Sequence, residues 1–189
     1  MNGLIRRAGI RRNEPIPELA QIYVDGSCDN RGSRAGGWAI VVCLPERHPI
    51  VRAGGIPART TSQIAELTAA IKALEYAREH GLPQTRIVSD SKYVVRGAKY
   101  WVSLWKRSDW KTRSGEDVKN QALWRRLSEL DGPDILWVHI RGHRGNVYNE
   151  MADKAAVNAR WDEQRRGMSD GEAAGEDGRQ RETEQHAVV

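Results

Sequence analysis

The chain is poor in cysteine and has no long apolar run, and each absence removes a class of protein. Cys28 and Cys43 are the only cysteines in 189 residues, and their spacing suggests no disulfide framework, which favours reduced thiols inside a cell. No apolar segment is long enough to cross a bilayer, and the first residues lack the apolar core of a secretory signal. We therefore expect a cytoplasmic protein without membrane contact, while the Arg-rich start leaves organelle or nuclear targeting open.

The charge balance favours a polyanionic partner. Hydrophobic residues make up 39% of the chain and charged residues 29%, with a formal net charge of +5 and a sequence pI near 9.4. A basic balance attracts nucleic acid and other polyanions. Because many proteins are mildly basic for no specific reason, the positions of the charges carry more information than their sum.

Composition divides the chain into three parts. Residues 1–20 hold four arginines and two prolines with little apolar periodicity, which predicts a basic mobile arm. Residues 164–189 contain almost no large apolar side chains, which predicts a disordered polar tail. The folded unit is therefore residues 21–163, long enough for one domain with its own core.

The folded unit is predicted to be α/β. Strands are expected at residues 22–25, 38–44 and 50–56, and the short loops between them indicate an antiparallel meander. Helices are expected from about residue 60, from Ser91 and from Asn149 to about residue 163, with further strands at 85–90 and 135–140. A strand that follows a helical crossover is usually parallel to the strand before it. Asp25 and Asp90, each expected at a strand end, would then share one edge of the sheet.

Four carboxylates lie where such a fold could bring them together. Asp25 and Asp90 end strands, Glu66 lies early in a helix, and Asp153 lies in the second turn of the final helix. Each alone has an ordinary explanation as a turn residue or a partner of the helix dipole. Clustered carboxylates repel one another and need cations, and hard oxygen ligands suit Mg²⁺ or Mn²⁺. Two such ions could activate a water molecule and stabilise the leaving oxygen of a phosphodiester.

Four motifs in order resemble type 1 ribonuclease H. They are Y-V-D-G-S-C, T-S-Q-I-A-E-L-T-A-A-I-K-A-L-E, S-D-S-K-Y-V and R-G-H-R-G-N-V-Y-N-E-M-A-D, and the match runs from about residue 21 to residue 159. The resemblance implies a mixed five-stranded sheet flanked by helices, with the middle strand antiparallel to the helix-linked ones, and a basic helical protrusion. It also implies a monomer that hydrolyses the RNA strand of RNA–DNA hybrids, leaving 5′-phosphate and 3′-hydroxyl ends.

The resemblance also assigns the catalytic centre. By motif position, Asp25, Glu66, Asp90 and Asp153 would be ligands of two Mg²⁺ ions, with Mn²⁺ as the other candidate. His143 would assist proton transfer or product release. The unperturbed pKa of a histidine suits proton traffic, and Gly142 and Gly145 would let the loop swing, whereas without the motif a solvated loop histidine would be the simpler interpretation.

The segment 92–126 is rich in basic residues and tryptophan. It holds ten lysines and arginines and four of the seven tryptophans, a combination that can attract phosphates and stack on bases. In the family this resembles the protrusion that grips the DNA strand, which implies contacts from Lys99, Trp101, Trp105, Lys106, Arg107, Trp110, Lys111 and Lys119. The alternative for the tryptophans is a small local core, which we expect for at least Trp105 and Trp124.

Distinguishing RNA from DNA requires contacts to the ribose 2′-hydroxyl. By motif position, the resemblance places five side chains along the minor groove of the hybrid: Cys28, Asn30, Ser62, Gln63 and Ser91. It also implies that Thr61 could hold a DNA phosphate and that Asn149 would lie beside the scissile region. Many family members have two amides where this chain has Ser62 and Gln63, and a Gly-Asn-Pro-Gly type of turn in place of residues 29–34. Two other functions stay open at this point, a nucleic-acid-binding module without cleavage and a broader nuclease or integrase-like enzyme.

Overall fold

The computed structural model describes residues 19–57, 59–82, 84–142 and 144–184, with side chains as far as Met168. Almost all of the predicted basic arm, residues 1–18, lies outside this part of the chain. No helix in the described part is both long enough and apolar enough to cross a membrane. The mobile basic arm therefore stays a prediction.

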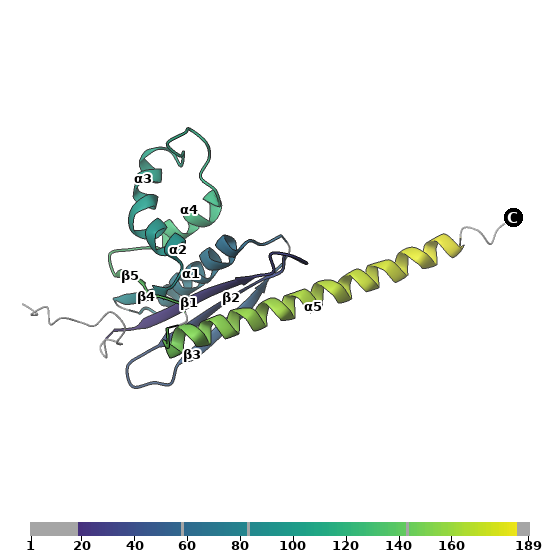
Figure 1. The fold of residues 1–189 in the computed structure, drawn as a ribbon, viewed down its shortest axis with the longest axis horizontal. Helices are drawn as coiled ribbons and strands as arrows, with labels where there is room; N and C mark the ends of the chain where they lie inside the picture. The colour runs from purple at the N-terminus through teal and green to yellow at the C-terminus, as the bar shows by residue number, and fades with distance from the viewer. Residues whose placement is uncertain (1–18, 58, 83, 143, 185–189) are drawn as a thin grey trace, which may run out of the picture.

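The centre of the fold is a mixed five-stranded sheet (Figure 1). Its strands are β1 (Gln21–Cys28), β2 (Gly36–Cys43), β3 (Ile50–Ile56), β4 (Thr85–Ser89) and β5 (Ile135–His139). They lie in the order β3-β2-β1-β4-β5, with β2 antiparallel to both neighbours, while β1, β4 and β5 are parallel. The predicted sheet is confirmed, and its antiparallel strand is β2, the middle strand of the meander.

Helices cover both faces of this sheet. They are α1 (Ser62–Glu79), α2 (Lys92–Arg96), α3 (Val102–Arg107), α4 (Gln121–Leu130) and α5 (Val147–Glu184), and a π-helical turn, η1 (Gly97–Trp101), joins α2 to α3. One face packs against α1, which in turn contacts α4, and the other face packs against α5. Figure 1 shows α3 and α4 standing away from the sheet as a protrusion.

The alternation of strand side chains builds two cores. Ile22 and Val24 of β1 face α1, whose apolar side supplies Leu67 and Leu74, and all four side chains are at most 1% exposed. Tyr23 lies on the opposite face of β1, in a smaller core with α5. Fully burying a Leu or Ile side chain contributes about 1.5–3 kcal/mol. These contacts therefore hold α1 and α5 to β1, the strand on which Asp25 lies.

The first strand is longer than the sequence predicted, and Asp25 is not its last residue. Antiparallel pairing with β2 carries β1 on to Cys28, which lies opposite Gly36. Parallel pairing with β4 ends earlier, at Tyr23 opposite Val88. β1 and β4 therefore separate beyond residues 23 and 88, close to Asp25 and Asp90.

The last helix also differs from expectation, since it runs to Glu184 where we predicted an end near residue 163 and a disordered tail. Glutamate, arginine, glutamine and alanine in this segment have high helix propensity, which offsets the cost of its four glycines. The same segment lacks an apolar stripe, and Figure 1 shows this part of α5 extending beyond the sheet. Residues 185–189 lie outside the described part.

Gly26 permits the close approach of α1 to β1. A Cβ atom at this position would come within 2.2 Å of the Ala65 carbonyl carbon and 2.3 Å of the Glu66 nitrogen. Both are backbone atoms and cannot rotate away, so the absence of a side chain at residue 26 fixes the spacing between Asp25 and Glu66.

We predict that Gly26→Ala destabilises the fold by about 1–3 kcal/mol, the usual cost of overpacking, because the helix must move away from the strand. Urea denaturation measures the change. Gly132→Ala is the matched control, because a Cβ there would meet nothing within 4 Å. Equal stability of the two variants would contradict the role of Gly26.

Candidate active site

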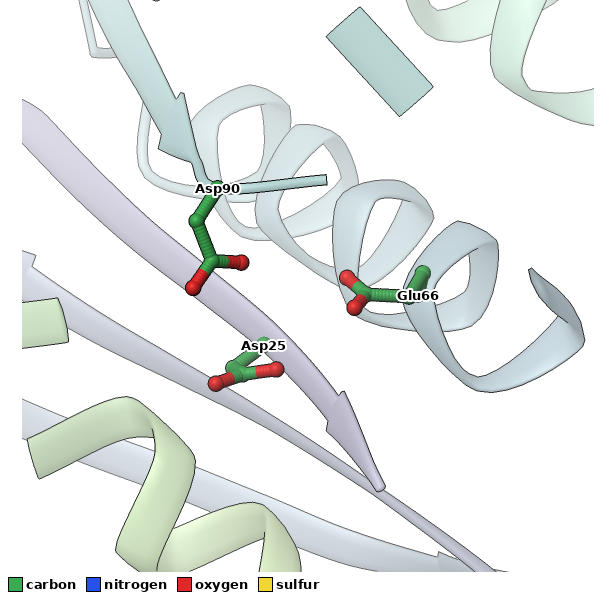
Figure 2. Close-up of side chains that lie close together, drawn as sticks. All are labelled: Asp25, Glu66 and Asp90. Carbon is green, nitrogen blue, oxygen red and sulfur yellow. The ribbon is translucent and has the colours of Figure 1, made fainter. Parts of the chain in front are cut away.

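Three carboxylates converge at the edge of the sheet where β1 and β4 separate. Asp25, Glu66 and Asp90 each place one oxygen within 4.8 Å of the others. They come from the strand β1, the helix α1 and the residue that follows β4 (Figure 2). The chain thus brings together acidic groups that lie far apart in sequence, as the motif order predicted.

Hydrogen bonds fix the two aspartates. Asp25 is 8% exposed, and its Oδ1 accepts from the Gly26 N–H at 2.7 Å. Asp90 Oδ2 accepts from Nδ2 of Asn149 at 3.2 Å, and the Asp90 carbonyl oxygen lies 3.1 Å from Nε2 of His139. A carbonyl only accepts, so this histidine nitrogen carries the proton. Asp90 is held from both its side chain and its backbone.

Glu66 is the least satisfied member of the group. Its Oε2 is buried and has no hydrogen-bond partner among the residues that the structure describes. A buried charged oxygen without a partner carries a large desolvation cost. This orphaned acceptor faces two further carboxylates, which is the donor set that a divalent cation would satisfy.

Burial and mutual repulsion shift the acidities of the group. Burial, followed by the charges of Asp90 and Asp153, raises the pKa of Asp25 to about 7. Burial, followed by the charges of Asp25, Asp90 and Asp153, raises the pKa of Glu66 to about 9. Asp153, half-buried on α5, thus adds its field to the three converging carboxylates.

Of the other predicted catalytic residues, His143 lies outside the described residues. Asn149, which the motifs placed beside the scissile region, is 3% exposed and bonded to Asp90. The contacts of Asn149 and His139 with Asp90 were not foreseen, because they join residues 59 and 49 positions apart.

Predicted substrate contacts gather beside this site. Asn30 Nδ2 donates to Ser62 Oγ at 3.3 Å, although the two residues are 32 positions apart. Cys28 Sγ donates to the Thr60 carbonyl oxygen at 3.2 Å. Thr61, Ser62 and Gln63 are exposed at the start of α1. The structure therefore assembles most of these residues at one end of the sheet.

Thr61 and Ser91 also have local structural roles. The Thr61 hydroxyl accepts from the Ile64 N–H at 3.2 Å and caps α1. The Ser91 hydroxyl accepts from the Val94 N–H at 3.4 Å and caps α2. Each cap satisfies a free N–H at a helix start, so an interaction of either residue with substrate stays a prediction.

The tryptophans of the protrusion form a packed cluster. Trp105 lies 5.4 Å from Trp124, 5.8 Å from Trp101 and 6.4 Å from Trp110, measured between ring centroids. Trp124 is 0% exposed and Trp110 is 5% exposed. Trp110 therefore packs inside the protrusion and does not offer a free ring face for stacking, contrary to the expected nucleic-acid contact. Trp101 and Trp105 are only partly buried.

The basic side chains of the protrusion point to solvent. All five of the predicted lysine and arginine contacts are exposed: Lys99, Lys106, Arg107, Lys111 and Lys119. They differ in their partners, since Lys111 forms an ion pair with Asp117 at 2.7 Å. In the described part of the chain no ion pair engages Lys99 or Lys119. These two charges are the most available to a polyanion.

A family model for ribonuclease H matches residues 17–160 of the sequence. The chain belongs to the ribonuclease H family. It is 40% identical over 139 residues to the ribonuclease H of Cyanothece sp., covering 74% of this chain and 87% of that one. It is 37% identical over 140 residues to human ribonuclease H1, covering 74% of this chain and 49% of that protein. The chain is thus a member of a nuclease family.

Solved structures agree with this assignment. A type 1 ribonuclease H with the type 2 active-site motif is 29% identical, with a TM-score of 0.65 over 77% of this chain and 74% of that one. A foamy viral protease-reverse transcriptase, solved with an RNA/DNA hybrid, shares the fold with a TM-score of 0.69 at 24% identity, over 85% of this chain and 22% of that one. In this ribonuclease H fold the acidic group is able to hold a divalent cation.

The raised pKa values of Asp25 and Glu66 predict how the metal-free protein responds to pH. Asp25 and Glu66 have ordinary pKa values of 3.8 and 4.5 but about 7 and about 9 in the fold, so the folded state binds their protons more tightly. Their protonated forms favour folding fully below about pH 4, and this stability is lost as pH rises through 7 and 9. In EDTA, the melting temperature should therefore fall from pH 5 to pH 9.

Asp25→Asn should melt at a higher temperature than the native chain above pH 7 in EDTA, and its pH dependence should be flatter. Thermal melts followed by circular dichroism measure both effects. Asp134→Asn, which removes an exposed carboxylate, is the control and should follow the native curve. A native curve parallel to that of Asp25→Asn from pH 5 to pH 9 would refute the explanation.

Proposed function

We propose that this chain is an endonuclease that hydrolyses the RNA strand of RNA–DNA hybrids with two bound Mg²⁺ ions. The observation that carries the proposal is the convergence of Asp25, Glu66 and Asp90 within 4.8 Å in a ribonuclease H fold. Mn²⁺ could serve in place of Mg²⁺. A monomeric state and a cytoplasmic location stay predictions.

The four carboxylates Asp25, Glu66, Asp90 and Asp153 would hold the metal. When bound, divalent cations supply a water of lowered pKa and stabilise the oxygen that leaves the phosphorus atom. The protein's own part is to place the ligands. Asn149 and His139 hold Asp90, and Gly26 N–H holds Asp25. His143, four residues before the start of α5 in the sequence, is proposed to move a proton or to help the product leave.

Substrate would be bound on both sides of this centre. The exposed residues at the start of α1 and in the β1–β2 turn would meet the RNA strand, where ribose hydroxyls distinguish it from DNA. The basic protrusion would bind the DNA strand through phosphate contacts. Cleavage would leave 5′-phosphate and 3′-hydroxyl ends.

Mg²⁺-dependent cleavage of an end-labelled RNA–DNA hybrid tests the function, beside RNA duplex and DNA duplex substrates. We expect cuts in the RNA strand of the hybrid alone, with loss of at least about 100-fold in rate for Asp90→Asn, since removing a preorganised electrostatic group costs this much. Asp134→Asn is the matched control. Binding without cleavage in Mg²⁺ or Mn²⁺ would support a non-catalytic module, and cutting of the DNA duplex would support a broader nuclease.

The protrusion gives a separate prediction. Lys99→Ala and Lys119→Ala should each raise KM for the hybrid, and each should reduce the slope of log KM against log salt by about 0.9 if one phosphate contact is lost. Steady-state kinetics between low and moderate salt measure the slope. Arg78→Ala removes an exposed charge at the far end of α1 and should leave the slope unchanged. Slopes equal to the native value in both lysine variants would remove the protrusion from the binding surface.

A further inference from the structure

One carboxylate folds the turn between β1 and β2. Asp29 Oδ1 accepts from the N–H groups of Arg31 and Gly32, both at 3.1 Å. Its Oδ2 accepts from the Ser33 N–H at 3.0 Å and from the Ser33 hydroxyl at 3.3 Å. The Asp29 N–H donates to the Ala35 carbonyl oxygen at 3.0 Å and closes the turn. Many family members have a Gly-Asn-Pro-Gly type of turn at this position.

The same turn is joined to the start of α1 at three points, which we call the turn–helix contact. Cys28 Sγ donates to the Thr60 carbonyl oxygen at 3.2 Å. The Thr60 N–H donates to the Arg34 carbonyl oxygen at 2.9 Å. Asn30 Nδ2 donates to Ser62 Oγ at 3.3 Å. The first two bonds involve backbone atoms, and the third joins two exposed side chains.

The hydrogen bond between Asn30 and Ser62 is weak on its own. Both side chains are exposed, and a hydrogen bond between exposed groups competes with water and contributes little on its own. Asn30 is the residue directly after Asp29, so its position follows from the path of the turn. The carboxylate of Asp29 therefore keeps Asn30 beside Ser62.

The pair lies close to the metal-binding carboxylates. Ser62 precedes Glu66 by four residues on α1, about 6 Å along the helix axis. Asn30 and Ser62 together offer an amide and a hydroxyl group, which can both donate and accept hydrogen bonds. A ribose 2′-hydroxyl can also donate and accept, so it could bond to either group. Asp29 itself uses both carboxylate oxygens within the turn, so it has no direct part in binding.

We propose that Asp29 is a positioning residue that holds Asn30 against Ser62, so that the two side chains meet the RNA strand as one preorganised pair. This inference rests on the hybrid-cleaving function proposed above. Preorganisation lowers the entropic cost of substrate binding. Its loss therefore affects KM and the preference for ribose, while the carboxylate centre and kcat are left intact.

Kinetics of Asp29→Ala on the hybrid provide the first test. We expect KM to rise by roughly tenfold and kcat to stay within about twofold. Asp29→Asn keeps an acceptor for the Arg31 and Gly32 N–H groups, and KM should stay within about threefold of the native value. Glu46→Ala is the matched control, because it removes one exposed carboxylate from the neighbouring β2–β3 turn and should change neither constant.

A double-mutant cycle separates positioning from a general effect on folding. If Asp29 acts through Asn30, adding Asp29→Ala to Asn30→Ala should change KM by no more than about twofold, because the two effects are coupled. The rise in KM caused by Asp29→Ala should also be smaller on a hybrid whose RNA strand carries 2′-deoxy residues beside the cleaved phosphate. If the alanine variant does not fold, Asp29→Ser takes its place in the cycle.

Three results would overturn the inference: an unchanged KM in Asp29→Ala, a loss carried mainly by kcat, or a penalty that persists in full in the Asn30→Ala background. These outcomes are distinguishable from failure of the proposed function. If the native chain does not cut the hybrid at all, the function itself is wrong. If the native chain cuts and Asp29→Ala behaves like it, only the role of Asp29 is wrong.

Discussion

The fold holds Asp25, Glu66 and Asp90 together although burial and mutual repulsion both disfavour their charged forms. When two of these carboxylates are both ionised, charges about 5 Å apart repel by roughly 3 kcal/mol at an effective dielectric constant near 20. Relaxation would separate such groups unless the surrounding fold held them. Here each carboxylate comes from a different element, so separating them would require a strand or a helix to move within a packed core.

Packing rather than local bonding opposes this repulsion. The start of α1 cannot withdraw from β1 without exposing Leu67 and Leu74, and the bare backbone of Gly26 lets the helix lie close enough to present Glu66. On the other face, α5 brings Asn149 to Asp90 and adds the charge of Asp153. The apolar core thus holds together a group that is electrostatically unfavourable until a cation is bound, as expected for a preorganised site.

Much of this could be predicted from the sequence, and the exceptions have physical causes. The alternation in β1, the apolar stripe of α1 and the small alanines at 69, 70 and 73, all 0% exposed in the structure, are local patterns. The extension of β1 to Cys28 depends on its pairing register with β2, which no local pattern contains. The burial of Trp110 likewise depends on Trp105 and Arg125, whose guanidinium lies 4.8 Å from its ring centroid.

The carboxylates show the same division between local and long-range information. Their residue types and motif order identified the candidates, but nothing local in the sequence indicated that Glu66 would have an orphaned oxygen or that His139 would bond to the backbone of Asp90. The β1–β2 hairpin and the start of α1 carry Asp25 and Glu66 at one end of their contact and Asn30 and Ser62 at the other. Because one pair of elements positions both groups, the proposed substrate contacts and the carboxylates that could hold a metal share a single support. A change in the turn would then alter the first while the core preserves the second.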